Sequence, residues 1–215
     1  MRCICTILLL IGLSNLSISQ SDRFVETVKE YYRVDPFSGS FSGFIQALTS
    51  DTALLNKIIH KQTDSTGFHV SGEYNIFNPF SIKANKVSMM LYEIKEKRDE
   101  VNILTYFSYQ LTAFLPDNIA SRKVILRDYK RLCKKLSRDL FITHKKSLKD
   151  FKTSDNAGKI VSIEDGEITT FTHDDFFAEP AIVSWQTMGE SGQLALTIII
   201  KLKQENNSAI PFGMY

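Results

Sequence analysis

The sequence contains little cysteine and none of the short motifs that mark the common catalytic or metal sites. Its three cysteines are Cys3, Cys5 and Cys133, and the first two lie ahead of an amino-terminal apolar run. If that run is removed with its flanks, the chain keeps one cysteine and forms no internal disulfide. This excludes the disulfide-stapled secreted scaffolds, so the hydrophobic core alone must hold the fold.

Catalytic motifs are missing in the same way. No serine is followed three residues later by lysine, and the sequence has no His-Glu-x-x-His, no phosphate-cradling glycine loop and no paired-cysteine metal site. The nearest approach to a hydrolase nucleophile elbow is Gly39-Ser40-Phe41-Ser42-Gly43, where Phe41 occupies the position that the serine needs. The sequence therefore favours a protein that is not an enzyme, and it predicts no cofactor and no metal.

The amino terminus has the pattern of a cleavable export signal. Met1-Arg2 provides a positive start, residues 7–11 an apolar centre, and Ser17-Ile18-Ser19 the pattern of two small residues around a larger one before Gln20. A membrane-spanning helix needs about 20 apolar residues, and polar residues interrupt this run at 14–15. We therefore expect a signal peptide over 1–19, cleavage near Ser19-Gln20, no transmembrane segment in the mature chain, and a periplasmic or extracellular location.

Length and composition favour one folded domain over residues 20–215. The chain has 215 residues, of which 43% are hydrophobic, enough for a single sizeable core. Apolar periodicity predicts helices over 22–32, around 44–48 and over 51–59, and a change to alternating residues predicts a strand from Thr66. Two longer alternating runs, 80–94 and 101–114, flank a charged turn and predict a long β-hairpin.

The strongest helical pattern runs from Asn118 to about Ile142. One side of this helix is apolar and is expected to face the core; it comprises Ile125, Leu126, Tyr129, Leu132, Cys133, Leu136 and Leu140. The opposite side is basic; it comprises Lys123, Arg127, Lys130, Arg131, Lys134, Lys135 and Arg138. We use the term basic face for these seven residues throughout.

After the helix, the polar stretch 144–158 could serve as an internal hinge, and strands are expected over 159–172, 181–188 and 194–203. This order of elements predicts an α+β fold. A mostly antiparallel sheet built on long hairpins would carry the N-terminal helices and the long basic amphipathic helix on it.

Charge is concentrated in one region. Residues 118–152 hold 12 Lys and Arg against three Asp, although the whole chain has a formal net charge of only +2. A basic helix face can bind an anionic surface or an acidic protein partner. It can also be the solvated outer side of a helix packed on a sheet. Nucleic acid is unlikely as a partner because export removes the protein from most of it and no DNA- or RNA-binding motif accompanies the charge.

The four histidines are scattered at 60, 69, 144 and 173. A metal site would need at least two of them brought together with a carboxylate. His173, Asp174 and Asp175 form the one local cluster, in which an acid could orient the imidazole for catalysis; alternatively, they form a solvated turn. Cys133 lies within the apolar stripe and is interpreted as a small core residue.

Several short segments carry a resemblance to a known family. They are Asp35-Pro36-Phe37-Ser38, Asn56-Lys57, Lys61 to Thr66 and Asn78-Pro79-Phe80, followed by the hairpin. Together they resemble an exported bacterial family of hypothetical proteins without an assigned function. The resemblance implies export in bacteria and brings no catalytic residue, ligand or partner with it.

Three functions remain open from the sequence. The first is an exported, non-enzymatic protein of the envelope or periplasm that acts through binding or assembly. The second is an unrecognised hydrolase that uses His173 with Asp174 or Asp175. The third is a carrier of an apolar ligand, which would need a cavity of several hundred Å³ between the sheet and the helices.

Overall fold

The computed structural model describes residues 24–60, 67–75, 77–80, 84, 86–97, 103–149, 151–154, 160–172, 180–188 and 191–202. The expected signal peptide and the cluster at 173–175 lie outside these residues. A helix covers 24–31, followed by α2 (Phe41–Ser50) and later α3 (Ile119–Leu136). The strands are β1 (Leu54–His60), β2 (His69–Tyr74), β3 (Lys86–Lys97), β4 (Ile103–Pro116), β5 (Phe141–Ser147), β6 (Phe151–Ser154), β7 (Ile160–Thr172), β8 (Ala181–Met188) and β9 (Gln193–Leu202).

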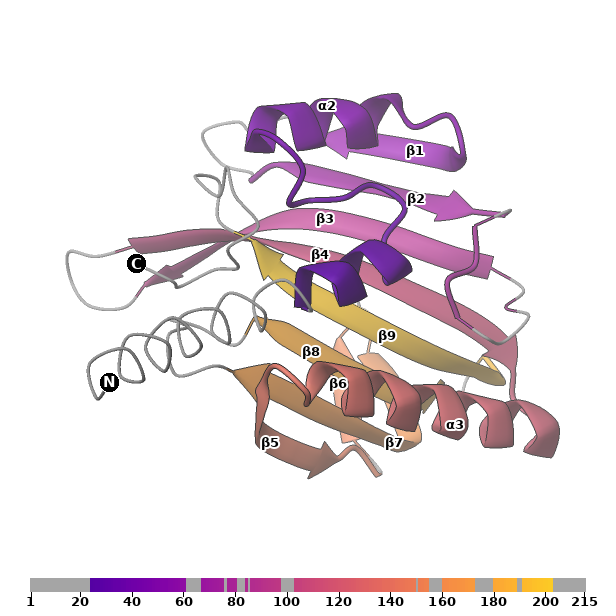
Figure 1. Ribbon diagram of the computed structural model, residues 1–215. Helices are drawn as coiled ribbons and strands as arrows, with labels where there is room; N and C mark the ends of the chain where they lie inside the picture. The colour runs from indigo at the N-terminus through magenta and orange to yellow at the C-terminus, as the bar shows by residue number, and fades with distance from the viewer. Residues whose placement is uncertain are drawn as a thin grey trace, which may run out of the picture.

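Within the described residues, these strands form one antiparallel sheet in the order β1-β2-β3-β4-β9-β8-β7-β5, and β6 also pairs with β7. The chain builds one half as a meander from β1 to β4. It then returns through α3 and builds the other half, which ends with β9 beside β4. Figure 1 shows the helices across one side of the twisted sheet, with α3 over β8 and β9. The edges of the sheet are therefore β1 at one end and β5 with β6 at the other.

The expectation of an α+β fold is wrong, because the protein has a largely β fold. Strands hold more than twice as many of the described residues as helices do. Two expected non-strand segments account for much of the difference: 51–59 was predicted as a helix, and 144–158 as a polar linker. The first contains most of β1, and the second contains the end of β5 and all of β6.

Both segments lie at edges of the sheet, which explains why their sequences mislead. An edge strand has a neighbour on one side only, and more of its side chains stay in solvent, so it need not alternate apolar and polar residues. In β1 only Leu54 is buried, and in β5 all seven residues are exposed. The apolar spacing of 54, 55, 58 and 59 resembles a helix turn, yet a bulge between Leu55 and Ile58 produces it in a strand.

The long hairpin is confirmed. β3 and β4 pair in continuous register from Lys86 opposite Phe114 to Lys97 opposite Ile103. As the alternation of residues predicts, Val87, Met89 and Leu91 are buried on the side of β3 that faces the helices. The strand expected over 159–172 is also confirmed as β7, and its pairing with β8 shifts in register between Ile163 and Gly166.

The basic amphipathic helix is confirmed as α3, but it is shorter than expected. Asn118 caps its first turn by accepting a hydrogen bond from the backbone N–H of Ser121 at 2.8 Å. Ile125, Tyr129, Leu132 and Leu136 are buried on its inner side, as the periodicity predicts. The helix ends at Leu136, and Leu140 is buried in the turn that follows it.

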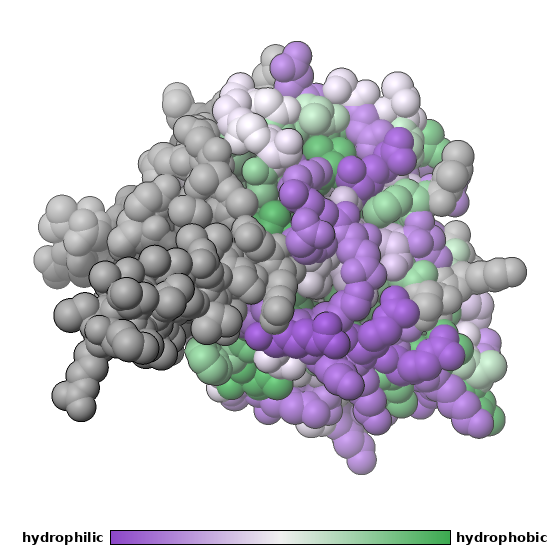
Figure 2. Space-filling view, viewed as in Figure 1, coloured by the Kyte–Doolittle hydropathy of each residue, from purple (hydrophilic) through white to green (hydrophobic). Residues whose placement is uncertain are grey.

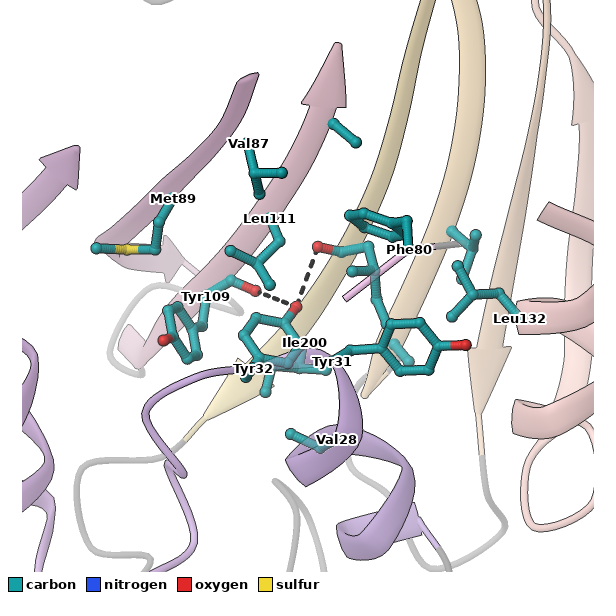
Figure 3. Packing of buried hydrophobic residues seen from close by; sticks show 14 of the residues in the cluster. Val28, Tyr31, Tyr32, Phe80, Val87, Met89, Tyr109, Leu111, Leu132 and Ile200 are labelled. Carbon is teal, nitrogen blue, oxygen red and sulfur yellow. Dashed lines mark hydrogen bonds between the residues drawn. The ribbon is translucent and has the colours of Figure 1, made fainter. Parts of the chain in front are cut away.

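The core lies between the helices and the covered side of the sheet. The helix over 24–31 contributes Phe24, Val25, Val28 and Tyr31, all buried, and Tyr32 follows directly. Figure 3 shows Tyr32 beside Tyr109 and Leu111 of β4, and the ring of Tyr31 toward Phe80 and Leu132. Aromatic rings thus fill much of the space where an apolar ligand would have to bind.

Candidate functional site

The basic face of α3 is the strongest candidate surface. Six of its seven residues are exposed, and Lys135 is half-buried. Figure 2 shows hydrophilic side chains gathered over α3 on the side that faces away from the sheet. The sequence therefore predicts this surface correctly, because a helix that buries one stripe must turn the opposite stripe to solvent.

Three of these seven cations have no nearby acid in the described part of the chain. Lys123, Lys130 and Lys134 form no ion pair within 4.0 Å with any carboxylate of the described residues. Lys135 differs, because its ammonium contacts the Glu30 carboxylate and lies 5.6 Å from the centre of the Tyr31 ring. Lys135 therefore links α3 to the helix over 24–31, whereas the other three lysines are available to a partner.

Exposed apolar side chains lie near both ends of α3 in the chain. Phe141 and Ile142 open strand β5 directly after the turn that follows α3, and they are 58% and 51% exposed. Ile119, at the other end of α3, is 77% exposed. A basic surface with exposed large apolar residues beside it is the combination that peripheral proteins use at lipid surfaces.

A hollow of about 580 Å³ lies between the helix over 24–31 and the end of α3. Its lining is mostly charged and consists of Glu26, Thr27, Lys29, Glu30, Lys135, Arg138 and Asp139. Three cations and three carboxylates suit a polar ligand, whereas the apolar-carrier hypothesis requires an apolar lining. Lys135 and Arg138 connect this hollow to the basic face.

A partly buried polar cluster joins the inner side of α3 to β7 and to Lys145 of β5. The Tyr129 hydroxyl lies 2.5 Å from the Thr169 hydroxyl, and the Lys145 ammonium lies 2.9 Å from the Glu167 carboxylate. Burial opposes the ionisation of Glu167, but hydrogen bonds from Lys145 and Tyr129 outweigh it and lower the Glu167 pKa.

Cys133 belongs to the same cluster. Burial raises the pKa of its thiol, and hydrogen bonds with Thr169 and Tyr129 oppose this rise only in part. The reactive form of a cysteine is the thiolate, so this thiol is poorly suited to nucleophilic attack at neutral pH. We therefore interpret the cluster as a structural connection between α3 and the sheet.

The segment 39–43, which partly matches a nucleophile elbow, has a structural role. Ser40 caps α2, since its hydroxyl accepts a hydrogen bond from the backbone N–H of Gly43 at 3.1 Å. Gly39 precedes it with φ of 75°, a left-handed conformation that favours glycine. The weak catalytic candidates His173, Asp174 and Asp175 lie outside the described residues, so the hydrolase alternative stays a prediction.

The structure brings together two histidines that the sequence separates. His60 of β1 lies directly opposite His69 of β2, and their ring centres are 5.7 Å apart. Sequence reasoning missed this pair because it assigned 51–59 to a helix, which hid the β1–β2 pairing. In the part of the chain that the structure describes, no group of three or more His, Cys, Asp or Glu residues could hold a metal.

Comparison of the chain with protein-family models, curated proteins and solved structures gives no match. Among the helices that the structure describes, none is both long and apolar enough to cross a membrane. The functional argument therefore depends on the surfaces and side chains described above.

Proposed function

We propose that the protein is an exported, non-enzymatic envelope protein that binds an anionic lipid surface through the basic face of α3. The observation that carries this proposal is the position of Lys123, Lys130 and Lys134, which are exposed on one side of one helix without a carboxylate partner among the described residues. Solubility alone would be served as well by mixed charges. Cations that have no nearby carboxylate repel one another, and an anionic partner removes this repulsion.

A lipid surface fits better than the other anionic partners. Ile142 lies opposite the buried Phe171, on the side of the sheet that carries α3, and is 51% exposed; such a side chain gains free energy when it enters the headgroup region. Each cation near an anionic membrane contributes about 1 kcal/mol to binding. An acidic protein partner would bind the same cations, and the experiment below distinguishes such a partner from lipid.

The test compares the mature wild-type protein with the Lys130→Glu, Lys134→Glu double variant. Vesicles of phosphatidylcholine alone and vesicles that also contain phosphatidylglycerol are sedimented with each protein at low and moderate salt. We expect the wild type to bind only the anionic vesicles and to dissociate as salt rises, because screening acts over about 8–10 Å at physiological ionic strength. The double variant should bind at least about tenfold more weakly.

A matched control is the Lys95→Glu, Lys201→Glu double variant, which changes the net charge equally. Lys95 lies on β3, and Lys201 follows the buried Ile200 on β9, so its side chain points to the side of the sheet away from α3. This variant should bind the anionic vesicles nearly as well as the wild type.

Equal binding by all three folded proteins would contradict the proposal. If the protein binds native envelope fragments and this binding disappears after the fragments are treated with protease, the partner is an acidic protein and not lipid.

A further inference from the structure

Two imidazoles lie side by side at the outer edge of the sheet. His60 ends β1 and His69 begins β2, and the two residues are direct partners in the antiparallel register. Their rings are nearly parallel, with an interplanar angle of 10° and centres 5.7 Å apart. Val70, the next residue after His69, is completely buried toward the helices, so both histidines project from the opposite side of the sheet.

The separation of the two rings suits a shared metal ion. An imidazole nitrogen binds Zn²⁺ at about 2.0–2.1 Å, so two rings on one ion have centres roughly 5 Å apart. The observed 5.7 Å is close to this value, and rotation of each side chain about its own bonds can direct one nitrogen of each ring to a common point. No backbone movement is required, because cross-strand partners are already adjacent.

The chemistry of the two side chains indicates which ions the pair would bind. The pair supplies the two histidines that the sequence analysis required but no carboxylate, so water must take the place of the carboxylate. Imidazole nitrogens select zinc, copper or nickel over calcium and magnesium, which prefer oxygen ligands.

We infer that His60 and His69 form a two-imidazole site for a divalent transition-metal ion such as Zn²⁺, with water in the remaining coordination positions. The site is independent of the basic face and of lipid binding. It joins β1, the outermost strand, to β2. Because β1 pairs with one strand only and has a bulge between Leu55 and Ile58, an ion held across this pair would stabilise this edge of the sheet.

The experiment is a zinc titration of the mature protein without a histidine tag, followed by calorimetry and by the thermal unfolding midpoint. We expect one zinc ion per chain and a midpoint that rises with zinc concentration, because a ligand that binds the folded state stabilises it by mass action. His60→Ala and His69→Ala should each weaken zinc binding at least tenfold and remove the rise in midpoint. His144→Ala is the matched control, since His144 is an exposed histidine on the other edge of the sheet and lies opposite Thr170 rather than a second histidine.

A second measurement uses the wild type alone and does not depend on a variant folding correctly. Substoichiometric Cu²⁺ broadens nearby NMR signals, so the backbone amides around 58–60 and 69–71 should lose intensity first. Absence of zinc binding by the wild type would overturn the inference. So would equal weakening by His144→Ala, or broadening that begins near His144 rather than near the pair.

Discussion

The side chain of Tyr32 is hydrogen-bonded to the backbone of Tyr109, on the strand beneath it. Its hydroxyl lies 2.9 Å from the Tyr109 carbonyl oxygen and 3.0 Å from that of Ile198, and the two tyrosine rings are 4.4 Å apart. These carbonyls belong to β4 and β9, where the two halves of the sheet meet. One phenol therefore connects the first helix to the centre of the sheet, and burial raises its pKa well above the usual value.

Replacing Tyr32 with Phe should lower the free energy of unfolding by about 1–2 kcal/mol. The ring contact with Tyr109 would remain, while a buried hydrogen bond would be lost, which costs this amount in comparable sites. Urea denaturation followed by circular dichroism measures the change. Tyr92→Phe, on the opposite side of β3, should change stability by less than about 0.5 kcal/mol; equal effects of the two substitutions would argue against the special position of Tyr32.

Asp117 and Arg122 form a bidentate pair just before and within the first turns of α3, with both nitrogen–oxygen distances 2.6 Å. The hydrogen bond from Arg122 lowers the pKa of Asp117. A carboxyl whose pKa is lower in the folded state stabilises the fold above its unfolded pKa of about 3.9, and this contribution is lost as the pH falls through the folded value.

The stability difference between the wild type and Arg122→Met should therefore shrink as the pH falls from 7 toward 2. At neutral pH the pH-dependent part should stay below about 1 kcal/mol, because the pair is partly exposed to solvent. Denaturation at several pH values measures it, and an NMR titration of the variant should return the Asp117 pKa toward its ordinary value. When Asp117 is replaced by Asn, the further substitution Arg122→Met should change the free energy of unfolding by an amount that does not vary with pH over this range.

Cys133 should react slowly with a bulky thiol reagent in the native mature protein and rapidly after unfolding in guanidinium. Two features act together: the side chain is half-buried on the inner side of α3, and burial raises the thiol pKa. The native rate should also increase with pH, because more thiolate forms. Rapid native labelling at pH 7 would show that this side of α3 is more accessible than the structure indicates.

The exported protein should begin near Gln20. Amino-terminal sequencing of the protein recovered from the periplasm or culture medium tests this directly, because we expect cleavage after the small residues Ser17 and Ser19. Recovery of a chain that begins at Met1 would remove the expectation of cleavage and, with it, the reason to exclude Cys3 and Cys5 from the mature protein.

Local pattern was sufficient for the elements whose surroundings are regular. β3 alternates because Val87, Met89 and Leu91 face the helices, and α3 shows a helical period because one side of it packs on β8 and β9. The same reasoning predicted the basic face of α3. In each case the residues that define the pattern all face the same environment, so their periodicity is visible in the chain.

Other features depend on residues that are distant in sequence. Leu55, Ile58 and Ile59 are spaced like a helix turn, and pairing with β2 makes them a bulged edge strand. The polar residues of β5 form a strand because Glu167 to Thr172 of β7 present unpaired backbone groups to them. The partnership of His60 with His69 and the hydrogen bonds of Tyr32 likewise exist only after the sheet assembles. Periodicity reports the environment along one element, whereas hydrogen-bonded neighbours across the sheet decided these features.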